Sequence, residues 1–466
     1  MRAISCMVIA GGVVLVLLQA VRPIIPTKAA TAELRAPTEI RRILEKDCYS
    51  CHSDQRRLSW FDEIVPAYWL VRHDILNARE HLNFSTLGSK PPAVQRSTLY
   101  EAVNMIRLSE MPLPSFVALH PAAKTTPEEL AALMEYLAPW SPVSGYLGNP
   151  RARSLAGSDA ASGGAPAITP DGAIRSVSLA VVVPEFDGFP FDPSFEGWKP
   201  ISTTDRGDNN TFRFILGNDI AVKAAESGNI SPWPDGTRFA KIAWQQEPGA
   251  DGLVHPGKFV QVELMLKDAH RYRNSDGWGW GRWRGSELTP YGQDARFVSE
   301  CTSCHLPMRR NDFVYTLPIT TATVDDDAVV NNRAAALPAN LPYQPLRWSA
   351  ITMYVDPRNQ TTATLYGNDA AMQAVQACNT IGAAPVYPTG SVIALVTWAQ
   401  RDDPHWFGAR IPDAPQSVEF VRVAAPGQGS SYRRFADPEL KEVRPTADAA
   451  ALRTSFVLSL SPACLP

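Results

Sequence analysis

Two short stretches of the chain combine the residue types that can hold a redox cofactor. Each has two cysteines three positions apart and a histidine directly after the second, at Cys48–His52 and at Cys301–His305. This spacing lets two thiols add to the two vinyl groups of one porphyrin and brings the histidine to the iron as an axial ligand. A zinc site would need further Cys or His residues nearby, and a thiol–disulfide redox pair would not need the histidine. The residues expected to hold two covalently bound c-type haems are Cys48, Cys51, His52, Cys301, Cys304 and His305.

Length and composition set the frame for these motifs. A chain of 466 residues predicts about three domains. With 45% hydrophobic and 20% charged residues it has the composition of a globular protein. The net charge of -3 and the lack of a long basic run argue against a nucleic-acid partner. Forty prolines indicate many loops and short strands.

An apolar run, Ala3–Val21, follows Met1-Arg2 and is typical of an export signal. A cleavage site of small residues lies at Ala30-Thr31-Ala32. The run also approaches the ~20 residues that span a bilayer, so retention as a membrane anchor is the alternative. Because c-type haem is attached outside the cytoplasmic membrane, we expect a periplasmic protein, with residues 1–35 as signal or anchor.

The remaining cysteines allow a disulfide. Of seven cysteines, four belong to the haem motifs and Cys6 lies in the apolar run, which leaves Cys378 and Cys464. An exported protein can form disulfides, and this one would close a long loop and contribute about 4–5 kcal/mol. Two unpaired buried thiols are the alternative.

The elements around the first motif predict a small all-α domain at residues 36–140. A short helix from Pro37 to Leu44 leads to Cys48, and Thr126 with Pro127 begins a closing helix. This is the plan of a small cytochrome c. The domain also resembles the short haem-binding domains attached to many periplasmic proteins. The residues that carry the resemblance are Cys48–His52, Trp69–Asp74, Leu82–Ser85, Met111–Pro114 and His120–Pro121.

The sixth ligand of the first haem has two candidates. Met111 precedes Pro112 in a loop before the last helix, where small cytochromes c place their methionine ligand. His73 is the rival, whereas His81 and His120 are expected to be ordinary hydrogen-bonded residues. A six-coordinate haem would make this domain an electron carrier.

After a linker at residues 141–177, which is rich in Gly, Ser, Ala and Pro, the sequence repeats itself. Trp198 and Gly217-Asn218-Asp219 recur 150 positions later as Trp348 and Gly367-Asn368-Asp369. Each copy predicts a helix after Gly-Asn-Asp and a meander of alternating strands. The copies cover residues 178–320 and 321–466, and the second has no C-x-x-C-H motif, so it should hold no haem.

The first copy resembles the cytochrome P-460 family. The residues that carry the resemblance are Trp233–Thr237, Phe239–Lys241, Trp278–Gly281, Cys301–His305 and Asp312–Thr316. The resemblance implies a mainly antiparallel β fold with a C-terminal haem motif. The fold class expected for the chain is therefore a small all-α cytochrome c-like domain followed by two mainly antiparallel β (α+β) P-460-like repeats. Family members include hydroxylamine-oxidising enzymes, whose haem is cross-linked to a lysine, and relatives that only bind gases such as nitric oxide.

Lys241 is the candidate for such a cross-link. It shares one strand face with Phe239 and Ala243, because side chains alternate along a strand. The haem-free copy has Leu395 at this position, so the face is expected to be interior, where an ammonium is costly unless it is used or neutralised. The alternative is a lysine that extends to solvent. Lys223 aligns with a glutamine and is expected on a solvated helix face.

A proton acceptor near the second haem is harder to assign. Glu263 recurs as Glu419 in the haem-free copy, so a structural role is expected. The resemblance implies an acidic residue shortly after the haem motif, where Asn311 and Asp312 stand, and Asp312 is the predicted catalytic carboxylate. The aromatic run Trp278–Trp283 would either wall a distal pocket or fill the β core. No Met or His stands out as a second ligand, so the haem on His305 is expected to be five-coordinate.

These observations predict a dihaem cytochrome with an electron-relay haem and an open haem that binds a small nitrogen species. As an enzyme it would oxidise hydroxylamine and pass electrons to a partner cytochrome or a membrane carrier. The rival hypotheses are a non-enzymatic binder of nitric oxide and a pure electron-transfer protein. The haem-free copy would either cap the sheet or form a homodimer surface.

Overall fold

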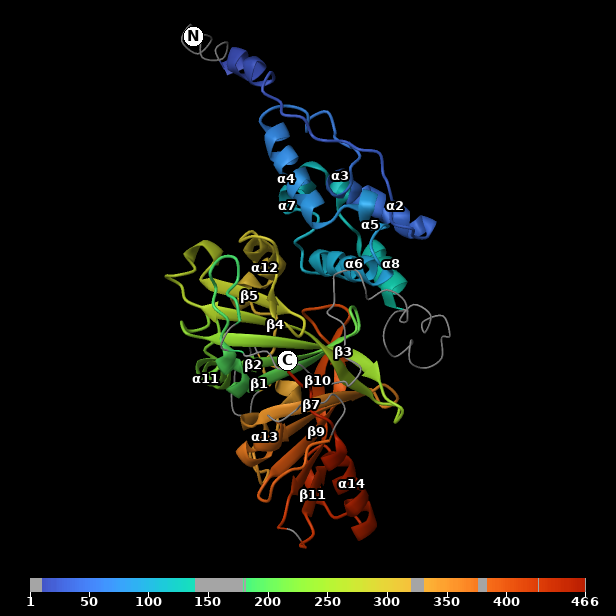
Figure 1. Cartoon of the computed structure of the whole chain (residues 1–466). Coiled ribbons are helices and arrows are strands. Elements are labelled where there is room, and N and C mark those ends of the chain that lie inside the picture. Colours follow the sequence, from blue (N-terminus) through green and yellow to red (C-terminus); the bar gives the residue numbers. More distant parts are fainter. Residues whose placement is uncertain are drawn as a thin grey trace. The chain divides into compact units, whose positions relative to one another are not determined.

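The computed structural model describes residues 11–138, 179, 182–319, 331–375, 384–425 and 427–465 (Figure 1). The chain divides into two compact units, Met1–Pro139 and Trp140–Pro466. Within the described residues, no helix combines the length and apolar character needed to cross a membrane. Part of the predicted export run, the linker and Cys378 lie outside the described residues. Cys464 belongs to a disulfide, whose predicted partner is Cys378.

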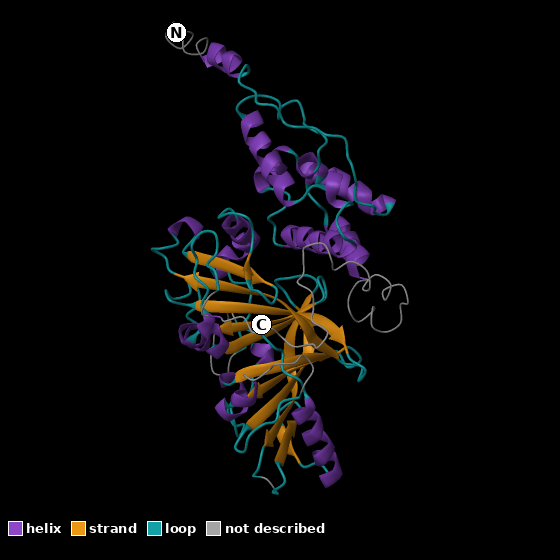
Figure 2. Ribbon diagram, in the orientation of Figure 1, coloured by secondary structure: helices purple, strands orange, loops and turns teal. Residues whose placement is uncertain are grey.

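The described regular structure of the N-terminal unit is helical, as predicted (Figure 2). The closing helix begins where its capping residues predict, because Thr126 accepts from the N–H of Glu129 and the Glu129 side chain accepts from the N–H of Thr126. The helices are α2 Thr38–Asp47, α3 Tyr49–His52, α4 Ala67–His81, α5 Phe84–Leu87, α6 Pro92–Arg107, α7 Pro114–Leu119, η1 Pro121–Ala123 and α8 Pro127–Leu137.

The core of this unit forms from one apolar stripe on each long helix. Helix α2 buries Ile40, Ile43 and Leu44, the stripe that its sequence predicts, and α8 buries Leu133 and Leu137. Burying a side chain of this size stabilises the fold by about 1.5–3 kcal/mol. The packed helices hold the first haem motif, with Cys48 between α2 and α3 and with Cys51 and His52 in α3.

In the residues that the structure describes, the C-terminal unit is built on one antiparallel sheet of 12 strands. Figure 2 draws these strands in orange. The strands are β1 Lys199–Arg206, β2 Thr211–Gly217, β3 Arg238–Pro248, β4 Val254–Lys267, β5 Trp278–Arg284, β6 Thr289–Pro290, β7 Ser349–Asp356, β8 Thr361–Gly367, β9 Val392–Asp402, β10 Ala409–Arg422, β11 Ser431–Ala436 and β12 Lys441–Val443. The helices are η4 Pro193–Gly197, α11 Asp219–Ser227, η5 Arg273–Ser275, α12 Phe297–His305, η6 Leu306–Asn311, η7 Arg333–Ala335, η8 Pro345–Arg347, α13 Asp369–Val375 and α14 Ala447–Ser459.

The strands close into a barrel. They follow the order β1-β2-β3-β4-β7-β8-β9-β10, and β10 pairs again with β1. Two short pairings join β1–β6 to β7–β12: Val254 lies opposite Val355, and Asp205 lies opposite Arg410. The sequence predicts two P-460-like repeats, whereas the described residues form a single barrel, to which strands of both segments contribute. Pairing the edges in this way satisfies backbone groups that would otherwise be open.

The recurring Gly-Asn pair makes the same contacts in both parts of the barrel. A Cβ on Gly217 or Gly367 would lie 2.9 Å from the Cβ of the alanine four residues on, so only glycine fits between strand and helix. The Asn218 side chain accepts from the third residue of α11 at 3.0 Å, and Asn368 does the same for α13 at 3.0 Å. The recurring Gly-Asn pair therefore begins a helix at the corresponding place in each part of the barrel: α11 follows β2, and α13 follows β8.

The two faces of β3 pack into different cores. Ala240, Ile242 and Trp244 lie in a cluster with residues of β2 and β4. Phe239, on the opposite face, lies in a cluster that contains Cys301 and two tryptophans of β5, Trp278 and Trp280. Helix α12 contacts β5 on this side (Figure 1). The face that carries Lys241 is therefore the face that the second haem motif covers.

Two candidate haem sites

The first site is organised by the hydrogen bond of its histidine. Helix α2 ends beside Cys48, and Cys51 and His52 lie in the single turn of α3. The His52 Nδ1–H donates to the carbonyl of Leu82 at 3.1 Å, which leaves Nε2 free to bind a metal. Burial lowers the pKa of His52, so the imidazole is neutral, as a metal ligand must be.

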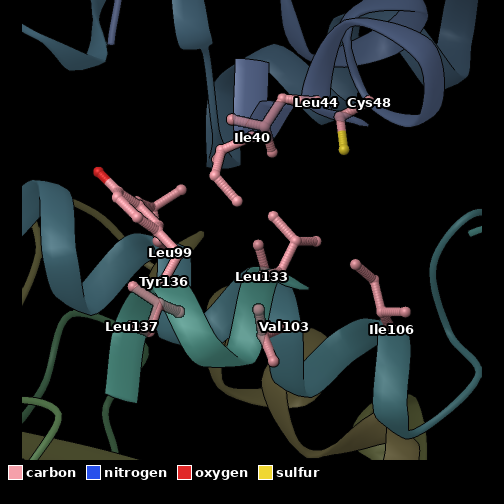
Figure 3. Close-up of a pocket in the computed structure, with 10 residues that line it drawn as sticks. Ile40, Leu44, Cys48, Leu99, Val103, Ile106, Leu133, Tyr136 and Leu137 are labelled. Atoms are coloured by element: carbon pink, nitrogen blue, oxygen red, sulfur yellow. The ribbon is translucent and has the colours of Figure 1, made fainter. Parts of the chain in front are cut away.

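An apolar pocket lies beside Cys48 (Figure 3). The sulfur of Cys48 points into this pocket. A porphyrin attached at this sulfur would find an apolar surface for its ring, so the residues present fit the cofactor. The lining residues come from α2, α6, α8 and the turn after α2: Ile40, Leu44, Cys48, Leu99, Ala102, Val103, Ile106, Leu133, Tyr136 and Leu137.

The candidates for the sixth ligand lie in different surroundings. The side chain of His73 is 69% exposed and contacts Asp74, so it faces solvent. His120 is hydrogen-bonded as predicted, with Nε2 2.9 Å from Asp62 Oδ2. Met111 is half-buried just after α6, and its N–H donates to the Met105 carbonyl at 3.2 Å. Met111 therefore remains the predicted ligand.

The second site repeats the histidine geometry of the first. Helix α12 carries Cys301, Cys304 and His305. The His305 Nδ1–H donates to the Phe313 carbonyl at 2.7 Å, so Nε2 is again the free nitrogen. Burial lowers the pKa of His305 to about 4. The Trp280 ring centroid lies 4.5 Å from that of His305, so an aromatic wall fixes the ring.

Part of this site comes from the loop between β9 and β10, in the segment that has no haem motif. The His405 Nδ1–H donates to the Tyr315 carbonyl at 2.6 Å, and the Tyr315 hydroxyl donates to the Cys304 carbonyl at 2.7 Å. The rings of Trp406 and Tyr315 lie 5.5 Å apart. Neither His405 nor Trp406 was predicted from the sequence as part of this site. The loop between β9 and β10 (403–408) contains His405 and Trp406, whereas the corresponding loop between β3 and β4 (249–253) contains no aromatic residue. This difference between the two loops is the feature of the sequence that could have indicated a role for His405 and Trp406.

A row of charged side chains crosses the sheet on the same face. Lys241 of β3 lies opposite Glu263 of β4, which lies opposite Arg282 of β5. Lys241 Nζ forms an ion pair with Glu263, and Arg282 Nε lies 3.0 Å from Glu263 Oε1. Lys241 is 26% exposed and Glu263 14%. Lys241 therefore has a carboxylate partner, Glu263, at its predicted interior position. This pairing was not predicted from the sequence.

The electrostatic surroundings of this row favour the ionised form of Glu263 next to its cationic neighbours. Burial lowers the pKa of Lys241 to about 8, an effect that Glu263 opposes. Burial alone would raise the pKa of Glu263, but Arg282 and Lys241 hold it well below its usual range. The glutamate is therefore ionised at neutral pH. In the other strand set, Glu419 accepts from Arg453 Nη2 at 2.7 Å, so both glutamates neutralise a basic group, in line with the structural role predicted for Glu263.

Arg213 adds a further cation next to the row. Its Nε is buried and has no hydrogen-bond partner in the described residues, and burial lowers its pKa to about 9. With Lys241 and Arg282 it gives three cations for the single carboxylate of Glu263. A guanidinium with a free Nε–H in a cationic cluster fits a cofactor that carries carboxylates, as a haem does through its propionates. The residues present therefore fit a haem on α12.

Asp312 has contacts that stabilise the loop after α12. Its Oδ1 accepts from Lys267 Nζ at 2.8 Å and its Oδ2 accepts from the Trp233 N–H at 2.9 Å. Its φ of 47° ends η6 in the left-handed region. Asn311, the alternative, donates to the Val314 carbonyl at 2.6 Å. These contacts give Asp312 a structural role, and its catalytic role remains a prediction.

Substituting Asp312→Asn should separate the two roles. We expect a loss of about 3 kcal/mol in the free energy of unfolding, because the Lys267 side chain is only 8% exposed and would keep an unpaired charge. Guanidinium denaturation followed by tryptophan fluorescence measures this. We expect ligand binding at the second haem to be unchanged. Unchanged stability with a lost activity would instead assign Asp312 to catalysis.

Comparison with known families agrees with this geometry. Residues 9–139 match the family described as haem-binding domain, and residues 193–316 and 343–447 match the family described as cytochrome P460. No curated protein matches the chain. The described residues of the N-terminal match are helical and those of the C-terminal match form the barrel. The chain therefore contains a cytochrome P460 domain in its C-terminal unit and a haem-binding domain ahead of it.

Proposed function

We propose that this haem-binding cytochrome is a periplasmic dihaem c-type protein whose second haem binds or oxidises hydroxylamine or nitric oxide. One observation carries the proposal. In both C-x-x-C-H motifs the histidine Nδ1–H donates to a backbone carbonyl, at 3.1 Å for His52 and 2.7 Å for His305. This fixes one tautomer and aims Nε2 as a ligand in each motif.

The cysteines of the motifs support covalent attachment. Burial raises the pKa of Cys48 to about 12, of Cys51 to about 11 and of Cys301 to about 12. These sites therefore disfavour thiolates, which a metal such as zinc requires. A thioether carries no charge and suits the same surroundings. When bound, each haem supplies an iron centre for electron transfer or ligand binding.

The charged row supports a polar small ligand at the second site. Lys241, Glu263 and Arg282 lie on the face that α12 covers, and Trp280 and Phe239 give the same face an apolar border. Such a site can hold a small polar molecule with Arg282 or Lys241 as hydrogen-bond donors and can exclude bulk water. We propose that Met111 is the sixth ligand of the first haem. This haem would then relay electrons to a partner cytochrome or a membrane carrier.

A non-enzymatic nitric oxide binder is the second candidate. The observation that favours it is the ion pair between Lys241 and Glu263. An ammonium held by a carboxylate has no free electron pair with which to form a bond to the haem edge. If the pair persists in the loaded protein, Lys241 would only line the pocket.

We also propose that β7–β12 are a second, haem-free P-460-like repeat that serves as a scaffold. The support is the matched pair of Gly-Asn helix starts and the loop with His405 and Trp406, which packs on Tyr315 beside the haem motif. In this proposal the second repeat binds no cofactor of its own and supports the haem site of the first repeat through contacts with Tyr315.

The optical spectrum and the haem-peptide mass test the function. A strongly red-shifted Soret band, with Lys241 covalently attached to the haem peptide that contains Cys301, is the result expected for a hydroxylamine-oxidising protein. The matched control is Lys241→Met, which should return an ordinary c-type spectrum. Ordinary spectra in both proteins, with nitric oxide bound, would support the gas-binding candidate. Failure to bind either nitric oxide or hydroxylamine would contradict both.

A further inference from the structure

The segment that follows the apolar N-terminal run is hydrogen-bonded into the haem-binding domain. Residues 11–18 are helical. The Gln19 side chain then bonds both backbone groups of Val65, accepting from its N–H at 2.9 Å and donating to its carbonyl at 3.1 Å. The carbonyl of Val21 accepts from Trp69 Nε1 at 2.7 Å, and that of Pro23 accepts from the Tyr68 hydroxyl at 2.6 Å.

The same segment supplies part of the hydrophobic core. Ile25 is 2% exposed and lies in a cluster with Val65, Tyr68 and Ile75, against which Leu18 also packs. Cleavage at the small residues 30–32 would remove Ile25 and Leu18 from this core and leave Tyr68 and Trp69 without their acceptors. The family match also begins at residue 9, within the apolar run. Both observations support residues 11–30 as part of the mature domain.

The surface next to this segment has the composition of a membrane interface. Apolar side chains there are exposed, with Trp60 at 75%, Leu70 at 59%, Ile24 at 81% and Trp69 at 36%. Arg22 stands at the end of the run and pairs with Glu63 beside Trp60. Tryptophan and arginine next to an apolar helix are typical of the headgroup region of a bilayer. In the helix itself, residues 13–17 are between 46% and 70% exposed, and every one of them is Val or Leu.

We propose that the apolar run is retained as a membrane anchor and that the face formed by Trp60, Trp69, Leu70 and Ile24 lies on the lipid surface. The occupant of this face is a bilayer, because the face continues directly into the apolar run, whose residues 13–17 are exposed Val and Leu side chains. The first haem domain would then be held at the membrane, within reach of membrane electron carriers. This holds whichever ligand the second haem takes.

The fate of the N-terminus gives the first test. The full chain is produced in a bacterium that attaches c-type haem, and its membranes are washed with alkaline carbonate. We expect the protein to stay in the pellet and peptides from residues 19–30 to be present in its digest. Release by carbonate, or a mature N-terminus within residues 31–33, would overturn the proposal. Nitric oxide binding, measured on the same sample, reports separately on the proposed function.

The lipid contact gives the second test. The protein is reconstituted in vesicles whose lipids carry bromine, a quencher of tryptophan fluorescence at the bilayer surface. We expect quenching in the unmodified protein and its loss in the double variant Trp60→Phe and Trp69→Phe. The matched control is Trp348→Phe in the C-terminal unit, which should keep the quenching. Equal quenching in the double variant and the control would show that this face does not contact lipid.

Discussion

Replacing Cys301 and Cys304 by serine is expected to reduce the covalently bound haem from two per chain to one and to abolish the binding of nitric oxide and hydroxylamine. In the proposed dihaem protein the two thiols of α12 would form the thioether bonds, and His305 lies one residue beyond them. Haem staining of the denatured chain and the pyridine haemochrome spectrum measure the haem content. Optical titration measures the ligand binding.

The matched variant replaces Cys48 and Cys51. It should also lose one haem, but it should keep ligand binding, because the N-terminal unit is compact by itself and holds a separate site. Loss of ligand binding in this variant alone would assign the open haem to the first domain. Unchanged covalent haem in either variant would contradict attachment at that motif.

Substituting Glu263→Gln should lower the free energy of unfolding of the barrel by about 3 kcal/mol. Removing one partner of a buried ion pair typically costs about 3–5 kcal/mol, and we take the lower end because solvent reaches a quarter of Lys241. Arg282 loses its carboxylate partner as well. Glutamine keeps the shape of the side chain, so the effect reports on charge. Guanidinium denaturation of the haem-loaded protein measures it.

Glu439→Gln is the control for this substitution. Glu439 pairs with Lys441 at 2.9 Å, but the two side chains are 68% and 72% exposed. Its loss should change the free energy of unfolding by less than about 0.5 kcal/mol. An equally small effect of Glu263→Gln would show that the bound haem compensates the cluster through its own charged groups. The ion pair would then be a feature of the haem-free chain only.

The sequence predicted those features that depend on short spacing. The two C-x-x-C-H motifs, the capped start of α8 and the Gly-Asn helix starts each involve residues within five positions of one another, and local geometry determines them. Alternation along β3 placed Lys241 on the interior face for the same reason.

The sequence did not predict features that depend on cross-strand register. Glu263 becomes the partner of Lys241 only because β3 and β4 pair with irregular register between Ala243 and Gln246. His405 reaches Tyr315 across 90 residues, and nothing in local spacing indicates that contact. The same limit applies to the closed barrel, because the pairing of β1 with β10 joins residues about 200 positions apart.

That long-range pairing also sets an order of events while the chain is made. A strand can pair only when its partner has emerged, and domains form from the N-terminal end during synthesis. The edge of β1 at Asp205 therefore stays open until Arg410 is available, long after Cys301 has emerged. His405 and Trp406 arrive in the same late interval. In the proposed c-type cytochrome, the α12 motif would thus be complete and accessible for haem attachment before its last wall forms.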